Sequence, residues 1–128
     1  MNKKIDDENK YKMYIVINNN LSMGKGKIVA QACHVACQVT RILHGTNNEK
    51  YDNWLRAGEA KIVLKATEKE INELIDKYDN SKTSENNRCV YIHDAGFTQI
   101  PAGSLTAIAF FPIQKKDAPK EISKLKLL

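Results

Sequence analysis

The feature that most constrains the fold is an uninterrupted apolar run, Met13-Tyr14-Ile15-Val16-Ile17, inside a segment with strand character, residues 11–18. A strand with one face in water alternates apolar and polar residues, whereas a continuous run is typical of a strand buried on both faces. We therefore expect this strand to lie inside a sheet that is covered on both sides.

Strand and helix patterns alternate along the rest of the chain. We predict helices over residues 27–43 and 47–57, a third helix after a Thr67–Glu70 capping box, and strands over residues 61–66, 88–93 and 105–111. This alternation favours an α/β layered domain with a largely parallel sheet. The segment before the last strand is too short for a helical crossover, so that strand should run antiparallel to the one before it.

With 128 residues, the chain is long enough for one buried core, which we assign to residues 11–128. Residues 1–10 mix lysines with acids, which predicts a disordered, charged tail and fits neither a secretory nor a transit signal. No apolar run approaches the roughly 20 residues of a membrane-spanning helix, so we expect no membrane partner. Three cysteines without framework spacing suit a reducing compartment, which predicts a cytoplasmic protein.

Positive charge is concentrated in two segments of a chain whose net charge is +5. Residues 21–48 contain Lys25, Lys27 and Arg41 and no acid, and lysines outnumber acids again from Lys115 to the C-terminus. This distribution favours a polyanionic partner such as nucleic acid.

The predicted helix over residues 27–43 presents a narrow polar stripe. Its members are spaced four, three, four and three residues apart: Lys27, Gln31, His34, Gln38 and Arg41. A broad apolar face should pack on the sheet: Ile28, Val29, Ala32, Val35, Ala36, Val39, Ile42 and Leu43. A line of small residues, Ala30, Cys33 and Cys37, suggests close approach of another backbone. A solvated helix face would mix charges of both signs, whereas this stripe has no acid.

Two polar segments are predicted at the carboxyl edge of the sheet, where ligands bind in open α/β folds. Lys25 and Lys27 lie at a glycine-containing turn that opens a helix, where free backbone N–H groups favour anions. Asp94 directly follows a buried strand, and Thr98 lies four residues on. Taken alone, Asp94 and Thr98 could equally stabilise a turn.

Together these segments resemble the peptidyl-tRNA hydrolase family of archaea and eukaryotes (type 2). The resemblance rests on three motifs and extends over nearly the whole chain: Met23-Gly24-Lys25-Gly26-Lys27-Ile28-Val29-Ala30-Gln31 with Cys33-His34; Asp94-Ala95-Gly96 with Thr98-Gln99-Ile100-Pro101; and Leu125-Lys126-Leu127-Leu128. It implies a mixed, mostly parallel four-stranded sheet with helices on both faces, and a possible homodimer.

The activity that the resemblance implies is hydrolysis of the ester between peptide and tRNA, without a metal or other cofactor. The family's proposed catalytic set falls on Lys27, Gln31, Asp94 and Thr98. We assign tRNA contacts, to the 3′ end and the backbone phosphates, to Lys25, His34, Gln38 and Arg41. The chain departs from the family at Phe97, commonly arginine, and at Asn20, commonly aspartate; neither position is in the catalytic set.

Other functions give weaker matches to the sequence. A Cys33–His34–Asp94 triad is disfavoured because neighbouring helix residues point about 100° apart, and Cys33, His34 and Cys37 are too few for a closed zinc site. An RNA-binding module without catalysis would use the same basic surface. A nucleotide-binding enzyme would need a phosphate loop and metal-binding acids.

Overall fold

The computed structural model describes residues 7–84, 86–95, 100–101 and 103–128. Its elements follow one another in this order: β1 (Tyr11–Asn18), α2 (Lys25–Leu43), α3 (Glu49–Arg56), β2 (Lys61–Ala66), α4 (Glu68–Tyr78), β3 (Cys89–His93), β4 (Leu105–Phe110), β5 (Ile113–Gln114), a 3-10 turn (Lys115–Asp117), α5 (Lys120–Ser123) and β6 (Lys126–Leu127). In these described residues, no helix is long and apolar enough to cross a membrane.

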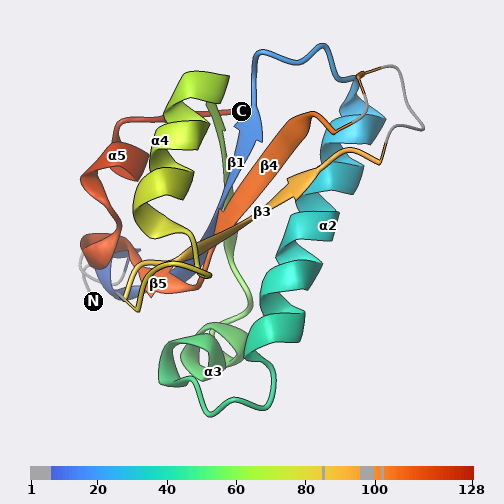
Figure 1. Ribbon diagram of the computed structural model, residues 1–128. Coiled ribbons are helices and arrows are strands. Elements are labelled where there is room, and N and C mark those ends of the chain that lie inside the picture. Colours follow the sequence, from blue (N-terminus) through green and yellow to red (C-terminus); the bar gives the residue numbers. More distant parts are fainter. Residues whose placement is uncertain (1–6, 85, 96–99, 102) are drawn as a thin grey trace.

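The strands form one mixed sheet in the order β3-β4-β1-β2-β6, and β5 pairs with the start of β1. Helices α2 and α3 cover one face of the sheet, and α4 and α5 cover the other (Figure 1). The predicted three-layer α/β architecture is therefore confirmed.

The predicted sheet, four-stranded and mostly parallel, is wrong in its details. Among the described residues the sheet has six strands, and β1–β2 is its one parallel pair of strands. Two of the strands, β5 and β6, have two residues each, too few for a periodic sequence signal. Strand β4 is antiparallel to β3, as predicted, but it also inserts beside β1 with antiparallel pairing.

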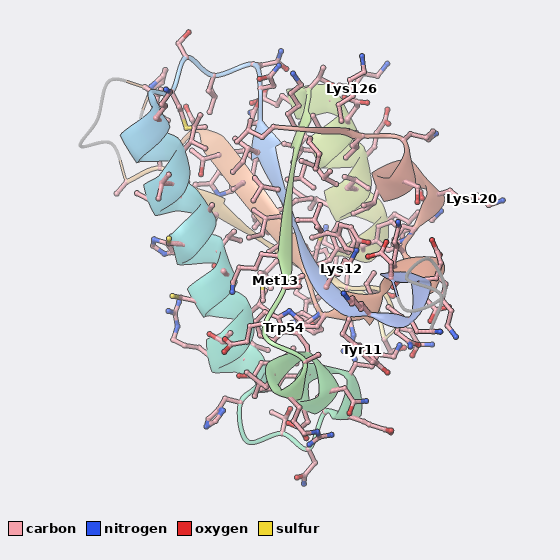
Figure 2. The ribbon with its side chains drawn as sticks, turned by 180° about the vertical axis from the view of Figure 1, so that it is seen from behind. Tyr11, Lys12, Met13, Trp54, Lys120 and Lys126 are labelled. Carbon is pink, nitrogen blue, oxygen red and sulfur yellow. The ribbon has the colours of Figure 1, made fainter. Side chains whose placement is uncertain are left out.

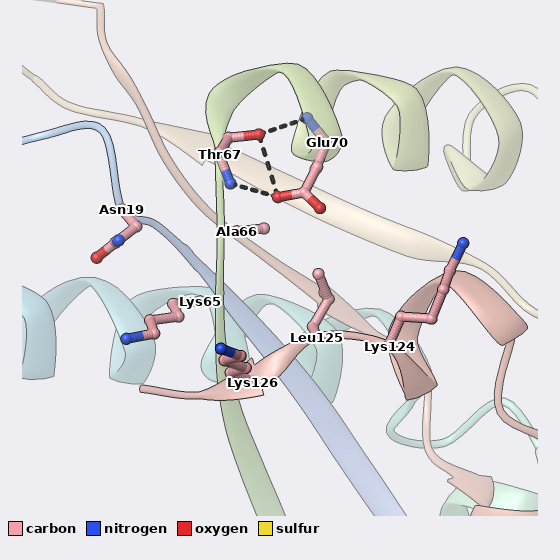
Figure 3. Close-up of a pocket in the computed structure, with 8 residues that line it drawn as sticks. All are labelled: Asn19, Lys65, Ala66, Thr67, Glu70, Lys124, Leu125 and Lys126. Carbon is pink, nitrogen blue, oxygen red and sulfur yellow. Dashed lines mark hydrogen bonds between the residues drawn. The ribbon is translucent and has the colours of Figure 1, made fainter.

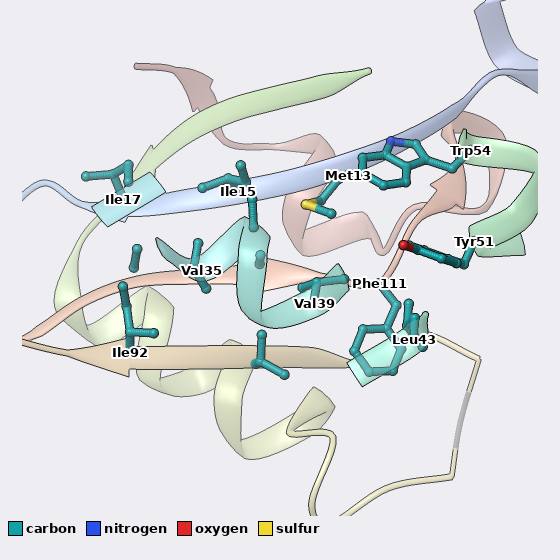
Figure 4. Packing of buried hydrophobic residues seen from close by; sticks show 14 residues of the cluster. Met13, Ile15, Ile17, Val35, Val39, Leu43, Tyr51, Trp54, Ile92 and Phe111 are labelled. Carbon is teal, nitrogen blue, oxygen red and sulfur yellow. The ribbon is translucent and has the colours of Figure 1, made fainter. Parts of the chain in front are cut away.

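Strand β1 is buried on both faces, as its apolar run predicted. Met13, Ile15 and Ile17 point into the core beneath α2 and α3 (Figure 4), while Tyr14 and Val16 belong to the core beneath α4 and α5. This double burial fixes β1 in the middle of the sheet. Its carboxyl end, with that of β2, therefore forms the central part of one sheet edge.

Helix α2 buries a narrower face than the sequence predicted. Val35, Ala36, Val39 and Leu43 are buried, but Val29 is 60% exposed and Ile42 is 38% exposed. The line of small residues, Ala30, Cys33 and Cys37, is also exposed, so no backbone in the described part of the chain packs there. Compared with the prediction, the buried face of α2 is rotated toward the polar stripe, so that it includes Gln31. That shift brings part of the stripe against the sheet.

The N-terminal segment is in contact with the domain where the structure describes it. Residues 7–9, inside the predicted tail, are helical. The Asp7 carboxylate pairs with Lys12 and Lys115, both at 2.7 Å, and these two ammonium groups lower its pKa to about 2, with Lys115 the larger contributor. Lys115 belongs to the basic C-terminal segment, and the Asp7 carboxylate offsets its positive charge.

Candidate active site

Polar side chains gather at the sheet edge where β1, β2 and β3 end. Lys27 lies in the first turn of α2, which follows β1, and Asp94 directly follows β3. Although β4 separates β1 from β3, α2 packs across β3 and β4, and this carries its first turn to the end of β3.

Lys27 and Asp94 form an ion pair in which Nζ donates to Oδ1. The side chains are 13% and 2% exposed, so the pair is shielded from water on most sides. The backbone of Asp94 is fixed from the β3–β4 loop, because its N–H donates to the Ser104 carbonyl at 2.8 Å and its carbonyl accepts from Gly103 at 3.0 Å. A carboxylate held rigidly in this way can fix the position of the lysine ammonium.

The N-terminus of α2 adds positive potential to the same place. Gly24 is the N-cap and offers no side-chain acceptor, and the first turn contains no acid. The N–H groups of such a turn and the aligned peptide dipoles favour negative charge. Lys27 and the start of α2 therefore make the site suited to an anion or a developing oxyanion.

Gln31, one helical turn after Lys27, is fixed by a buried threonine that sequence reasoning missed. Thr106 of β4 is fully buried, and its Oγ1 donates to Gln31 Oε1 at 2.6 Å. Because Oε1 accepts from Thr106, the groups that the Gln31 amide can offer a ligand are its N–H donors. The available signal was one hydroxyl in an otherwise apolar strand, Leu105-Thr106-Ala107-Ile108-Ala109-Phe110.

We expect Thr106→Val to lower the free energy of unfolding by about 1–3 kcal/mol, because Gln31 Oε1 would be left buried without a donor. Thr106→Ser, which keeps the hydroxyl, should retain most of the stability. Urea denaturation of both variants measures the difference. Equal stability of the valine variant and the parent would mean that the bond contributes nothing.

The four residues assigned to tRNA contacts are Lys25, which lies beside the predicted stripe, and three members of the stripe, His34, Gln38 and Arg41. Lys25, His34 and Arg41 are exposed, and Gln38 is half-buried, so all four can be reached from solvent. Thr98 and Phe97 lie outside the described residues. The structure thus brings together Lys27 and Asp94, with Gln31 one turn away, and leaves the proposed tRNA contacts as a surface line.

Asn20, one of the two departures from the family pattern, contacts the start of α4. Its Oδ1 accepts from the Glu68 backbone N–H at 2.6 Å, while neighbouring Asn18 donates to the Glu68 carboxylate and to the Leu105 carbonyl. These bonds tie the end of β1 to β4 and to the start of α4, the helix that follows β2. An aspartate at position 20 could accept the same N–H.

The geometry of the described residues favours neither a cysteine nucleophile nor a zinc site. Cys33, Cys37 and His34 are exposed along α2, and the described residues contain no group of three or more histidine, cysteine or acidic side chains that could hold a metal ion. Burial raises the pKa of the third cysteine, Cys89, to about 12, so its thiol stays protonated at neutral pH.

The chain is similar to known proteins over nearly its full length. Residues 11–128 match the model of the family described as peptidyl-tRNA hydrolase PTH2. A peptidyl-tRNA hydrolase of Methanocaldococcus jannaschii is 43% identical over 117 residues, which is 91% of this chain and 99% of that protein. One from Sulfurisphaera tokodaii is 39% identical over 91% of this chain and 98% of its own length. A probable peptidyl-tRNA hydrolase 2 of Caenorhabditis elegans is 40% identical over 79% of this chain, within 32% of its own length.

Proposed function

This chain belongs to the peptidyl-tRNA hydrolase PTH2 family, and from that premise we propose that it uses Lys27 and Asp94 to hydrolyse the ester that joins a peptide to tRNA. The products are free tRNA and the peptide, so the enzyme recycles tRNA from stalled or dropped-off peptidyl-tRNA. The observation that supports this assignment of residues is the shielded Lys27–Asp94 pair at the uncapped start of α2.

The reaction needs stabilisation of negative charge more than it needs a nucleophilic side chain. Water adds to the ester carbonyl carbon, the carbonyl oxygen becomes an oxyanion, and the ribose oxygen then leaves with a proton from the attacking water. In our proposal Lys27 Nζ and the N-terminus of α2 stabilise the oxyanion. Asp94 keeps the ammonium in place, so little reorganisation is needed as charge develops.

Gln31 and Thr98 complete the proposed catalytic set. The Gln31 amide, whose Oε1 accepts from Thr106, would donate to the substrate carbonyl. Thr98 would orient the attacking water. Along α2, Lys25, His34, Gln38 and Arg41 would contact the 3′ end and nearby phosphates of the tRNA; their accessibility supports this role. We further propose a cytoplasmic enzyme, where translation supplies the substrate, and a homodimer as a possible assembly.

The direct test is release of peptide from an N-blocked aminoacyl-tRNA by the purified protein, with and without EDTA. We expect the same rate in both, since the positive charge that faces the oxyanion comes from Lys27 rather than from a bound cation. The tRNA should be refolded beforehand and held at constant ionic strength, because divalent ions also fold tRNA. Loss of all activity in EDTA, restored by a divalent ion, would contradict the metal-free mechanism; no activity in either condition would contradict the function.

A further inference from the structure

A second group of lysines lies at the same sheet edge, on the far side of β1 from the Lys27–Asp94 pair. Lys65 near the end of β2 and Lys126 of β6 line a surface pocket of about 250 Å³ together with Asn19 from the turn after β1 (Figure 3). None of them belongs to the candidate active site.

Lys65 and Lys126 are direct cross-strand partners in the antiparallel β2–β6 pair. Like charges placed opposite each other on neighbouring strands are destabilising. Among the residues that the structure describes, neither ammonium forms an ion pair that would offset this repulsion. A bound anion between them would remove the unfavourable interaction, so the arrangement favours an anionic ligand.

The acid of this pocket has a structural role, and the remaining lysine points away from the other two. Glu70 Oε1 accepts from the N–H and the hydroxyl of Thr67, which completes the capping box of α4. Lys124 also lines an adjoining pocket with Glu70, Glu73, Lys77 and Glu121, in which acids outnumber lysines. Figure 3 shows its side chain directed away from Lys65 and Lys126. The anion site therefore consists of Lys65, Lys126 and the Asn19 amide.

The pocket lies at the same end of the sheet as the Lys27–Asp94 pair, a short distance across the strands. Lys126 lies at the same end of the sheet as the start of α2, whereas Lys120 lies apart on the α5 side (Figure 2). Between Asp94 after β3 and Lys65 on β2 there are three strand spacings, since β4 and β1 intervene. At about 4.8 Å per spacing the separation is about 14 Å, a span of a few nucleotides.

We propose that Lys65 and Lys126, assisted by Asn19, bind a backbone phosphate of the tRNA acceptor end while the 3′ ester lies at Lys27 and Asp94. This inference rests on the proposed function, because it requires tRNA as the substrate. The peptide part of the substrate has no regular series of anions, whereas each nucleotide adds a phosphate. The site contacts the tRNA backbone only. It therefore contributes affinity and fixes the position of the acceptor end, without any preference for its sequence.

The test compares Lys65→Gln/Lys126→Gln with the charge-matched control Lys50→Gln/Lys82→Gln, a half-buried and an exposed lysine outside the pocket and outside the basic C-terminal segment. We expect the pocket variant to bind uncharged tRNA about ten-fold more weakly at low salt. The slope of log affinity against log salt should also become shallower by about 0.7–0.9, since one phosphate contact is lost. Its single-turnover rate at saturating protein should equal that of the parent, and the control should match the parent in both measurements.

Two further measurements exclude a folding artefact. The pocket variant should melt at or above the parent's temperature, because the opposed charges are gone, and Lys65→Arg/Lys126→Arg should restore tRNA affinity. The proposal is overturned if the pocket variant keeps the parent's affinity and salt slope, if the control loses as much affinity, or if arginine fails to restore binding. Failure of the proposed function is distinct from all three, because the parent protein itself would then release no peptide.

Discussion

Replacing Lys27 with alanine is expected to lower the single-turnover rate of peptidyl-tRNA hydrolysis by about a hundred- to a thousand-fold, with little change in tRNA affinity. This is the usual cost of removing one positioned electrostatic group that faces a developing oxyanion. The rate falls more than the affinity because the interaction is made mainly in the transition state. Single-turnover kinetics at saturating protein, measured beside equilibrium binding of tRNA, separates the two effects.

Lys25→Ala is the matched control for this experiment. Lys25 is also a lysine in the first turn of α2, but it is exposed and forms no ion pair among the described residues. Its removal should weaken tRNA binding and leave the saturated rate unchanged. If Lys27→Ala instead keeps the full single-turnover rate and loses only affinity, Lys27 is a phosphate contact and the catalytic assignment is wrong.

Local sequence signals predicted most of the fold correctly. The strand over residues 61–66 has the predicted bounds, and Thr67 and Glu70 form the predicted capping box. These elements depend on residues close together in the chain, which a periodic pattern or a cap can reveal. The two-residue strands β5 and β6 have no such signal, because partner strands elsewhere in the chain define them.

The site was partly predictable for the same reason. The stripe spacing placed Lys27 and Gln31 on one face of α2, and Asp94 was expected at the same edge. The sequence could not show that the buried face of α2 is rotated to include Gln31, since this depends on how the helix crosses β3 and β4. Nor could it reveal the Thr106–Gln31 bond or the opposition of Lys65 and Lys126, which join residues far apart in sequence.

The second large effect concerns the Lys27–Asp94 pair as a unit. We expect Asp94→Asn to slow hydrolysis about as much as Lys27→Ala, because the ammonium loses the carboxylate that positions it. The double variant should then be little slower than either single variant, since residues that act together show non-additive losses. Rates that fall by the product of the two single effects would mean that Lys27 and Asp94 act independently.

The free energy of unfolding should rank Lys27→Ala, Asp94→Asn and the double variant differently from the rate of hydrolysis. Lys27→Ala leaves the Asp94 carboxylate, whose side chain is 2% exposed, without its cation. Breaking a buried pair from one side commonly costs about 3–5 kcal/mol of unfolding free energy. Adding Asp94→Asn removes the buried negative charge, so the double variant should recover part of that loss while remaining inactive. Urea denaturation of the parent, both single variants and the double variant gives the coupling energy directly. A double variant less stable than Lys27→Ala would show that Asp94 stabilises the site through its other contacts, and that the ion pair is not the main reason for its burial.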